Sequence, residues 1–101
     1  MYAVELCFAL DEGSIAPSVE AAAESARHNG RHPGARIEHL RVKRLGTQMY
    51  MVAFVAAARA DDARELARTI GLGVSAQLRH MRFVSLHIWA EDQLSMEETE
   101  W

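Results

Sequence analysis

The chain has one cysteine, one lysine and two prolines, and no apolar run approaches the length of a membrane helix. A lone cysteine, Cys7, excludes an intramolecular disulfide and fits a reducing compartment. A spanning helix needs about 20 consecutive apolar residues. Residues 1–10 contain Glu5 and no basic group, unlike a signal peptide. We therefore expect a cytoplasmic protein with no membrane segment.

A dense basic stripe is also missing. The net charge is −3, and the last eleven residues, EDQLSMEETEW, contain five acidic groups and no basic one. A nucleic-acid binder usually shows clustered lysine and arginine, so we expect no nucleic-acid partner. Residues 1–90 are predicted to form a single domain and residues 91–101 an acidic C-terminal tail. The excess of arginine over lysine and the 17 alanines are typical of a GC-rich bacterial genome.

Four segments have the alternation or the apolar character of strands. They are residues 2–10, 36–45, 49–58 and 81–89. The second is the most polar, which is typical of an edge strand. The third, MYMVAFVAAA, is apolar on both faces, which indicates a central strand.

Two segments have apolar residues at helical spacing. The first is residues 15–29, with Ser14 as N-cap and Asn29-Gly30 as its end. The second follows a capping box formed by Asp62 and Glu65 and is predicted to stop at Gly71. The resulting order, β-α-β-β-α-β, is that of a ferredoxin-like α+β fold. It predicts an antiparallel sheet with strand order 4-1-3-2 and both helices on one face.

The two-residue period of a strand assigns its side chains to opposite faces. To the helix-covered face we assign Val4, Leu6, Phe8, Leu40, Val42, Val52, Phe54, Val84, Leu86 and Ile88. To the opposite face we assign Glu5, Cys7, His39, Arg41, Lys43, Met51, Ala53, Val55, Phe83, Ser85, His87 and Trp89. Soluble monomers avoid large apolar patches of this kind. The second face is therefore predicted to be covered by another subunit, a ligand or the tail.

This uncovered face suggests a function. Small residues leave space above the sheet, and histidine, arginine, glutamate and tryptophan surround it, which suits a small polar or aromatic ligand. We expect a homodimer, a dimeric α+β barrel, that binds a small molecule or performs cofactor-free catalysis. By analogy of fold alone, such barrels include monooxygenases, isomerases and cyclases. The alternative is a non-enzymatic interaction or regulatory module that uses the same face.

Glu5 and His87 are the candidate catalytic pair, because a carboxylate can orient and charge a neighbouring imidazole. A purely structural pair remains the alternative. The candidate substrate-binding residues are His39, Arg41, Ser85, Phe83, Trp89 and Met51.

Other kinds of site are not indicated. His28 and His32 have no carboxylate or cysteine at ligand spacing, so we expect no metal and no cofactor. The basic loop around them, with Arg27, Arg31 and Arg36, either holds an anion or is simply solvated. RNA-recognition domains stack bases on aromatics of the two central strands. Here the residues assigned to that face of the central strands are Glu5, Cys7, Met51, Ala53 and Val55.

Overall fold

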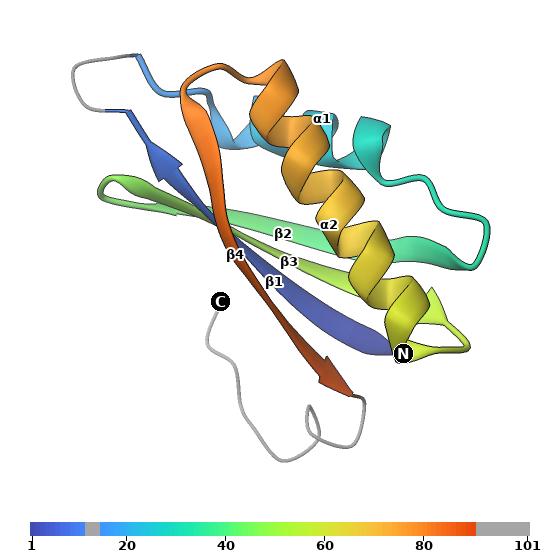
Figure 1. The fold of residues 1–101 in the computed structure, drawn as a ribbon. Coiled ribbons are helices and arrows are strands. Elements are labelled where there is room, and N and C mark those ends of the chain that lie inside the picture. Colours follow the sequence, from blue (N-terminus) through green and yellow to red (C-terminus); the bar gives the residue numbers. More distant parts are fainter. Residues whose placement is uncertain (12–14, 91–101) are drawn as a thin grey trace.

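The computed structural model describes residues 1–11 and 15–90, which form an α+β domain (Figure 1). Its elements are β1 (Tyr2–Leu10), α1 (Val19–Asn29), β2 (Ala35–Leu45), β3 (Gln48–Ala57), α2 (Ala60–Gln77) and β4 (Met81–Ala90). The predicted order β-α-β-β-α-β is confirmed. The predicted N-cap Ser14 and the acidic tail lie outside the described residues.

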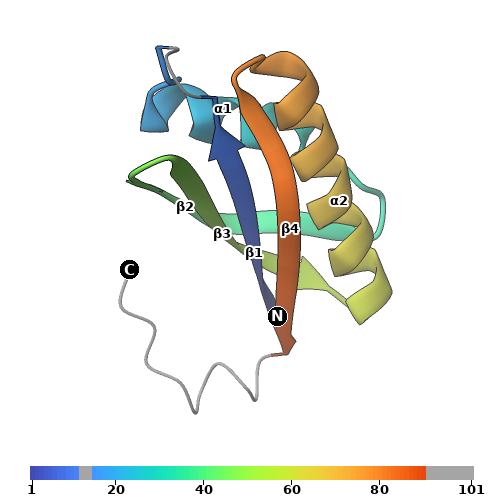
Figure 2. The same ribbon diagram turned by 60° about the vertical axis from the view of Figure 1, so that its left-hand side comes forward.

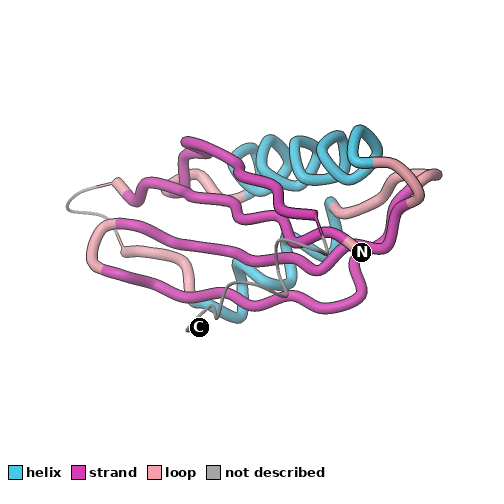
Figure 3. The backbone as a smooth tube through the Cα atoms, turned by 90° about the horizontal axis from the view of Figure 1, so that it is seen from below, coloured by secondary structure: helices cyan, strands magenta, loops and turns pink. Residues whose placement is uncertain are grey.

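The four strands form one antiparallel sheet in the order β2-β3-β1-β4, as predicted. Both helices lie on the same side of it (Figure 2), and Figure 3 follows the strands along the sheet from below. We call the side without helices the open face. Within residues 1–11 and 15–90, no helix is long and apolar enough to cross a bilayer.

The core lies between the sheet and the helices. From β1 it takes Val4, Leu6 and Phe8, each 0% exposed, as predicted. On β3 the predicted faces are wrong. Leu6 pairs with Met51, and the side chain of Met51 is fully buried in the core. Val52 therefore lies on the open face, opposite Glu5. Because β3 is apolar on both faces, alternation alone could not decide between the two assignments.

A bulge changes the faces of β4. The register shifts between Cys7, which opposes Ser85, and Phe8, which opposes Phe83. Val84 is the extra residue and is 55% exposed, so its assignment to the core is wrong. Phe83 instead packs on Phe8 under the helices, with ring centroids 5.6 Å apart, so its assignment to the open face is also wrong. A bulge adds one residue and thereby reverses the alternation beyond it.

A second bulge lies in β2, between Ile37 and His39. It does not disturb the predicted faces beyond it. Leu40 is buried and Val42 packs against the core, whereas Arg41 is exposed on the open face.

Helix α1 begins later than predicted. Its N-cap is Ser18, whose hydroxyl accepts a hydrogen bond of 3.0 Å from the backbone N–H of Ala21. Pro17 therefore precedes the cap, and Ile15 is 93% exposed. The predicted end at Asn29 is confirmed. The hydroxyl satisfies an N–H that the first helical turn leaves unpaired.

Helix α2 begins earlier and ends later than predicted. It starts at Ala60, so Asp62 lies inside the first turn and the predicted capping box is wrong. It also continues past Gly71 to Gln77. A Cβ at Gly71 would lie 2.7 Å from the ring of Phe83, so this glycine serves close approach to β4 rather than a helix end.

Candidate functional site

The open face consists of rows of directly opposed residues that run across the sheet. Arg41 opposes Val52, Val52 opposes Glu5, and Glu5 opposes His87. Next to this row lie two others: Lys43, Tyr50, Cys7 and Ser85 on one side, and His39, Phe54, Ala3 and Trp89 on the other. Basic groups therefore gather over β2, whereas the one acidic group of these rows lies on β1.

Glu5 and His87 are direct cross-strand partners, on the face that the alternation assigned to them. Such partners have Cβ atoms about 4.5–5.5 Å apart. No hydrogen bond or ion pair joins the two side chains in the described chain. His87 is exposed, and its ring meets Trp89 edge-on at a centroid distance of 4.3 Å. The two side chains are therefore close enough to contact the same ligand, although their catalytic roles remain predictions.

The middle of the open face is apolar and almost inaccessible to solvent. Ala3 is 1% exposed and Val52 is 6% exposed, although no helix lies over them. Ala3 has aromatic partners on both sides, Phe54 on β3 and Trp89 on β4. Phe54 also contacts the ring of His39, at a centroid distance of 6.0 Å. Buried small apolar side chains thus lie at the centre of the face, with aromatic and basic side chains around them.

The candidate binding residues separate into two groups. Four of them, His39, Arg41, Ser85 and Trp89, lie on the open face. The other two, Met51 and Phe83, lie under the helices, where Met51 is 0% exposed. In their place the open face carries aromatic and apolar residues of β3 that the alternation missed, namely Tyr50, Val52 and Phe54.

One signal in the sequence pointed to the correct face of β3. Gln48 and Tyr50 share a face, and both carry polar groups that need a partner or water. The alternative face, with Met49 and Met51, has none. In the structure the Tyr50 hydroxyl donates a hydrogen bond to Gln48 Oε1 at the surface.

Tyr50 also forms a hydrogen bond with the thiol of Cys7, its cross-strand partner. Partial burial raises the pKa of Cys7, and the nearby charge of Glu5 raises it further against the lowering effect of the Tyr50 hydrogen bond. Loss of hydration likewise raises the pKa of Tyr50. Cys7 is therefore a neutral thiol near neutral pH, unlike an activated cysteine nucleophile.

The corrected register removes one argument against nucleic acid. Tyr50 and Phe54 lie on the open face of a central strand, where RNA-recognition domains carry their stacking aromatics. Arg41 and Lys43 lie on the neighbouring strand, directly opposite Val52 and Tyr50. The expectation that the central strands carry no aromatic residue on this face is therefore wrong.

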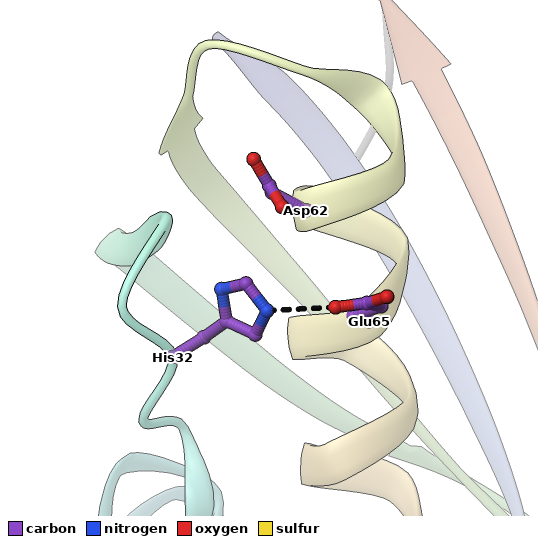
Figure 4. A group of neighbouring side chains, drawn as sticks. All are labelled: His32, Asp62 and Glu65. Atoms are coloured by element: carbon purple, nitrogen blue, oxygen red, sulfur yellow. Dashed lines mark hydrogen bonds and ion pairs between the residues drawn. The ribbon is translucent and has the colours of Figure 1, made fainter.

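His32 meets two carboxylates that the sequence gave no reason to place beside it (Figure 4). Ligand atoms of His32, Asp62 and Glu65 all lie within 4.8 Å of one another. The backbone N–H of Gly34 donates to His32 Nδ1 at 2.9 Å, so in the neutral ring the proton lies on Nε2, which donates to Glu65 Oε2 at 2.8 Å. A metal-bound histidine donates from its free ring nitrogen instead. The pattern fits a link between the loop and α2.

Comparison with known proteins found no family model and no curated protein that matches the chain.

Proposed function

We propose that the chain is a ferredoxin-like domain of the bacterial cytoplasm whose open face pairs with a second copy. The resulting dimeric α+β barrel binds a small molecule between its two sheets. The observation that carries the proposal is the row Arg41–Val52–Glu5–His87. It aligns a cation, an apolar floor, a carboxylate and an imidazole on a face that no helix covers.

Apolar burial favours a second sheet over the open face. Phe54 and Trp89 are only partly buried there, and covering them removes apolar area from water. Stacked sheets lie about 10 Å apart, and a ligand between them would contact the more exposed side chains Phe54, His87 and Trp89. A two-fold axis along the strands would place β2 of one copy over β4 of the other. Arg41 and Lys43 would then approach the side of the partner sheet that carries its carboxylate.

The chemistry of the rim defines the ligand class. Trp89 and Phe54 offer aromatic walls, and Arg41 offers a guanidinium that pairs with carboxylate, sulfonate or phosphate groups. The proposed ligand is therefore a small aromatic or polar anion. Glu5 and His87 can accept and donate a proton beside it, so acid–base catalysis needs no cofactor.

A His87→Ala variant tests the proposal when it is measured in two ways. The probe is anilinonaphthalene sulfonate, an aromatic sulfonate, and its fluorescence titration reports binding. We expect His87→Ala to weaken dye binding while changing the free energy of unfolding by no more than about 0.5 kcal/mol. His28→Ala, which removes an exposed imidazole from α1, is the matched control and should change neither.

The opposite pair of results would contradict the proposal. If His87 is buried in a dry contact, truncation leaves its partner unpaired at a cost of about 1–3 kcal/mol. Lost stability with unchanged dye binding would therefore support the interaction module instead of a ligand site.

Single-stranded nucleic acid is the second candidate, favoured by Tyr50 and Phe54 beside Arg41 and Lys43. Stacking a base on an aromatic side chain contributes about 1–3 kcal/mol. Fluorescence anisotropy with a labelled uridine octamer separates the two candidates. Binding that Tyr50→Ala weakens about tenfold or more would favour nucleic acid, whereas the small-molecule proposal predicts no binding of the octamer.

A further inference from the structure

A groove of about 820 Å³ lies where the last turn of α1 and the following loop meet β2. Three arginines line it: Arg27 from α1, Arg31 from the loop and Arg36 from β2. Ile37 and Leu40 contribute apolar surface to the same groove. Its volume lies within the range of about 300–1,000 Å³ that is usual for small-molecule sites.

The positive charge of this groove is only partly compensated. Arg36 is paired with Glu38, with Nη2 and Oε1 2.6 Å apart. Arg27 and Arg31 are both exposed, and within the described part of the chain neither side chain makes a hydrogen bond or ion pair. Three guanidinium groups and the carboxylate of Glu38 therefore leave an excess of two positive charges among the lining residues.

Other charged groups lie near the groove but outside its lining. The carboxyl end of α1 carries about half a negative charge, and Arg27 in its last turn is placed to complement it. Arg31 lies beyond the end of α1, so its positive charge does not serve to complement the helix dipole. Asp62 and Glu65 lie beside His32, but neither carboxylate is among the residues that line the groove.

We propose that this groove binds a small polyanion that carries phosphate or carboxylate groups. Guanidinium groups match the planar, bidentate geometry of both anions. Ile37 and Leu40 provide a surface for the carbon skeleton of such a ligand. The site is separate from the Glu5–His87 row, so it can exist whether or not the open face binds a ligand.

Two probes test the site and distinguish the two anions: inorganic pyrophosphate and citrate, titrated at low salt and followed by amide chemical shifts. We expect saturable binding of at least one probe, with shifts concentrated between Gly30 and Leu40. Tighter binding of pyrophosphate would assign phosphate, and tighter binding of citrate would assign carboxylate.

Charge-matched variants show whether the arginines act as a site. Arg31→Gln and Arg27→Gln should each weaken binding about tenfold, because each removes a charge-assisted hydrogen bond. Arg79→Gln removes the same charge from the exposed α2–β4 connection, outside the groove, and should change the affinity less than about twofold. Absence of saturable binding of both probes, or an equal loss in all three variants, would overturn the proposal.

Discussion

The two faces of the sheet use neighbouring residues of the same strands for different purposes. On β3, Met51 is buried under the helices, whereas Val52 lies in the centre of the open face between Arg41 and Glu5. The covered face contains only apolar side chains at its centre, which is what stability requires. The open face combines apolar, aromatic and charged groups, a mixture that a purely structural surface does not require. The proposal that the open face is a contact surface rests on this difference.

The largest expected effect compares two phenylalanines on opposite faces. Phe8 is 0% exposed and packs against Phe83, so Phe8→Ala should lower the free energy of unfolding by about 3–5 kcal/mol. Phe54→Ala on the open face should cost about 1 kcal/mol, because this side chain is only partly buried. Urea unfolding at equal protein concentration measures both. Equal losses would contradict the division between the two faces.

A second comparison uses two adjacent residues of α2. Gly71→Ala places a methyl group against the ring of Phe83 and should destabilise the fold by about 1–3 kcal/mol, despite the better helix propensity of alanine. Leu72→Ala, at a position that is 59% exposed, should change stability by no more than about 0.5 kcal/mol. Thermal unfolding of both variants decides whether Gly71 is needed for the close approach of α2 to β4. A stabilised Gly71→Ala variant would refute that role.

The smallest expected effect concerns pH on the open face. The pKa of the Cys7 thiol is raised above its ordinary value of 9.0, mainly by burial, so the folded state holds this proton more tightly than the unfolded state. The stability that the protonated Cys7 thiol contributes is fully present below about pH 9.0. It is lost as the pH rises through the folded-state pKa of this thiol. Unfolding measured across alkaline pH should therefore show a weaker decline for Cys7→Ala. An identical decline in both proteins would refute this contribution.

Local sequence patterns predicted most of the fold. The alternation of Val4, Leu6 and Phe8 on β1 and the stop at Asn29 are local signals, and both are confirmed. The order of elements followed from them. The alternation did not predict the faces of β3, because both are mainly apolar, and the polar groups of Gln48 and Tyr50 are the one local signal for the correct assignment.

The remaining errors come from contacts between residues far apart in the chain. The bulge at Val84 depends on how β4 pairs with β1, and Gly71 is determined by Phe83 of another element. His32 reaches Glu65 across 33 residues. Local alternation predicted the face on which Glu5 and His87 lie. It misplaced Met51 because both faces of β3 are apolar, and it misplaced Phe83 because of the bulge at Val84.

Sedimentation equilibrium tests the central claim, that the open face contacts a second copy. At high micromolar concentration the wild-type chain should sediment at twice its mass of 11.3 kDa. Phe54→Arg, which puts a charge on the open face, should shift it to the monomer, whereas Leu72→Arg on the exposed side of α2 should not. Circular dichroism confirms that both variants are folded. A clean wild-type monomer at this concentration would contradict the account.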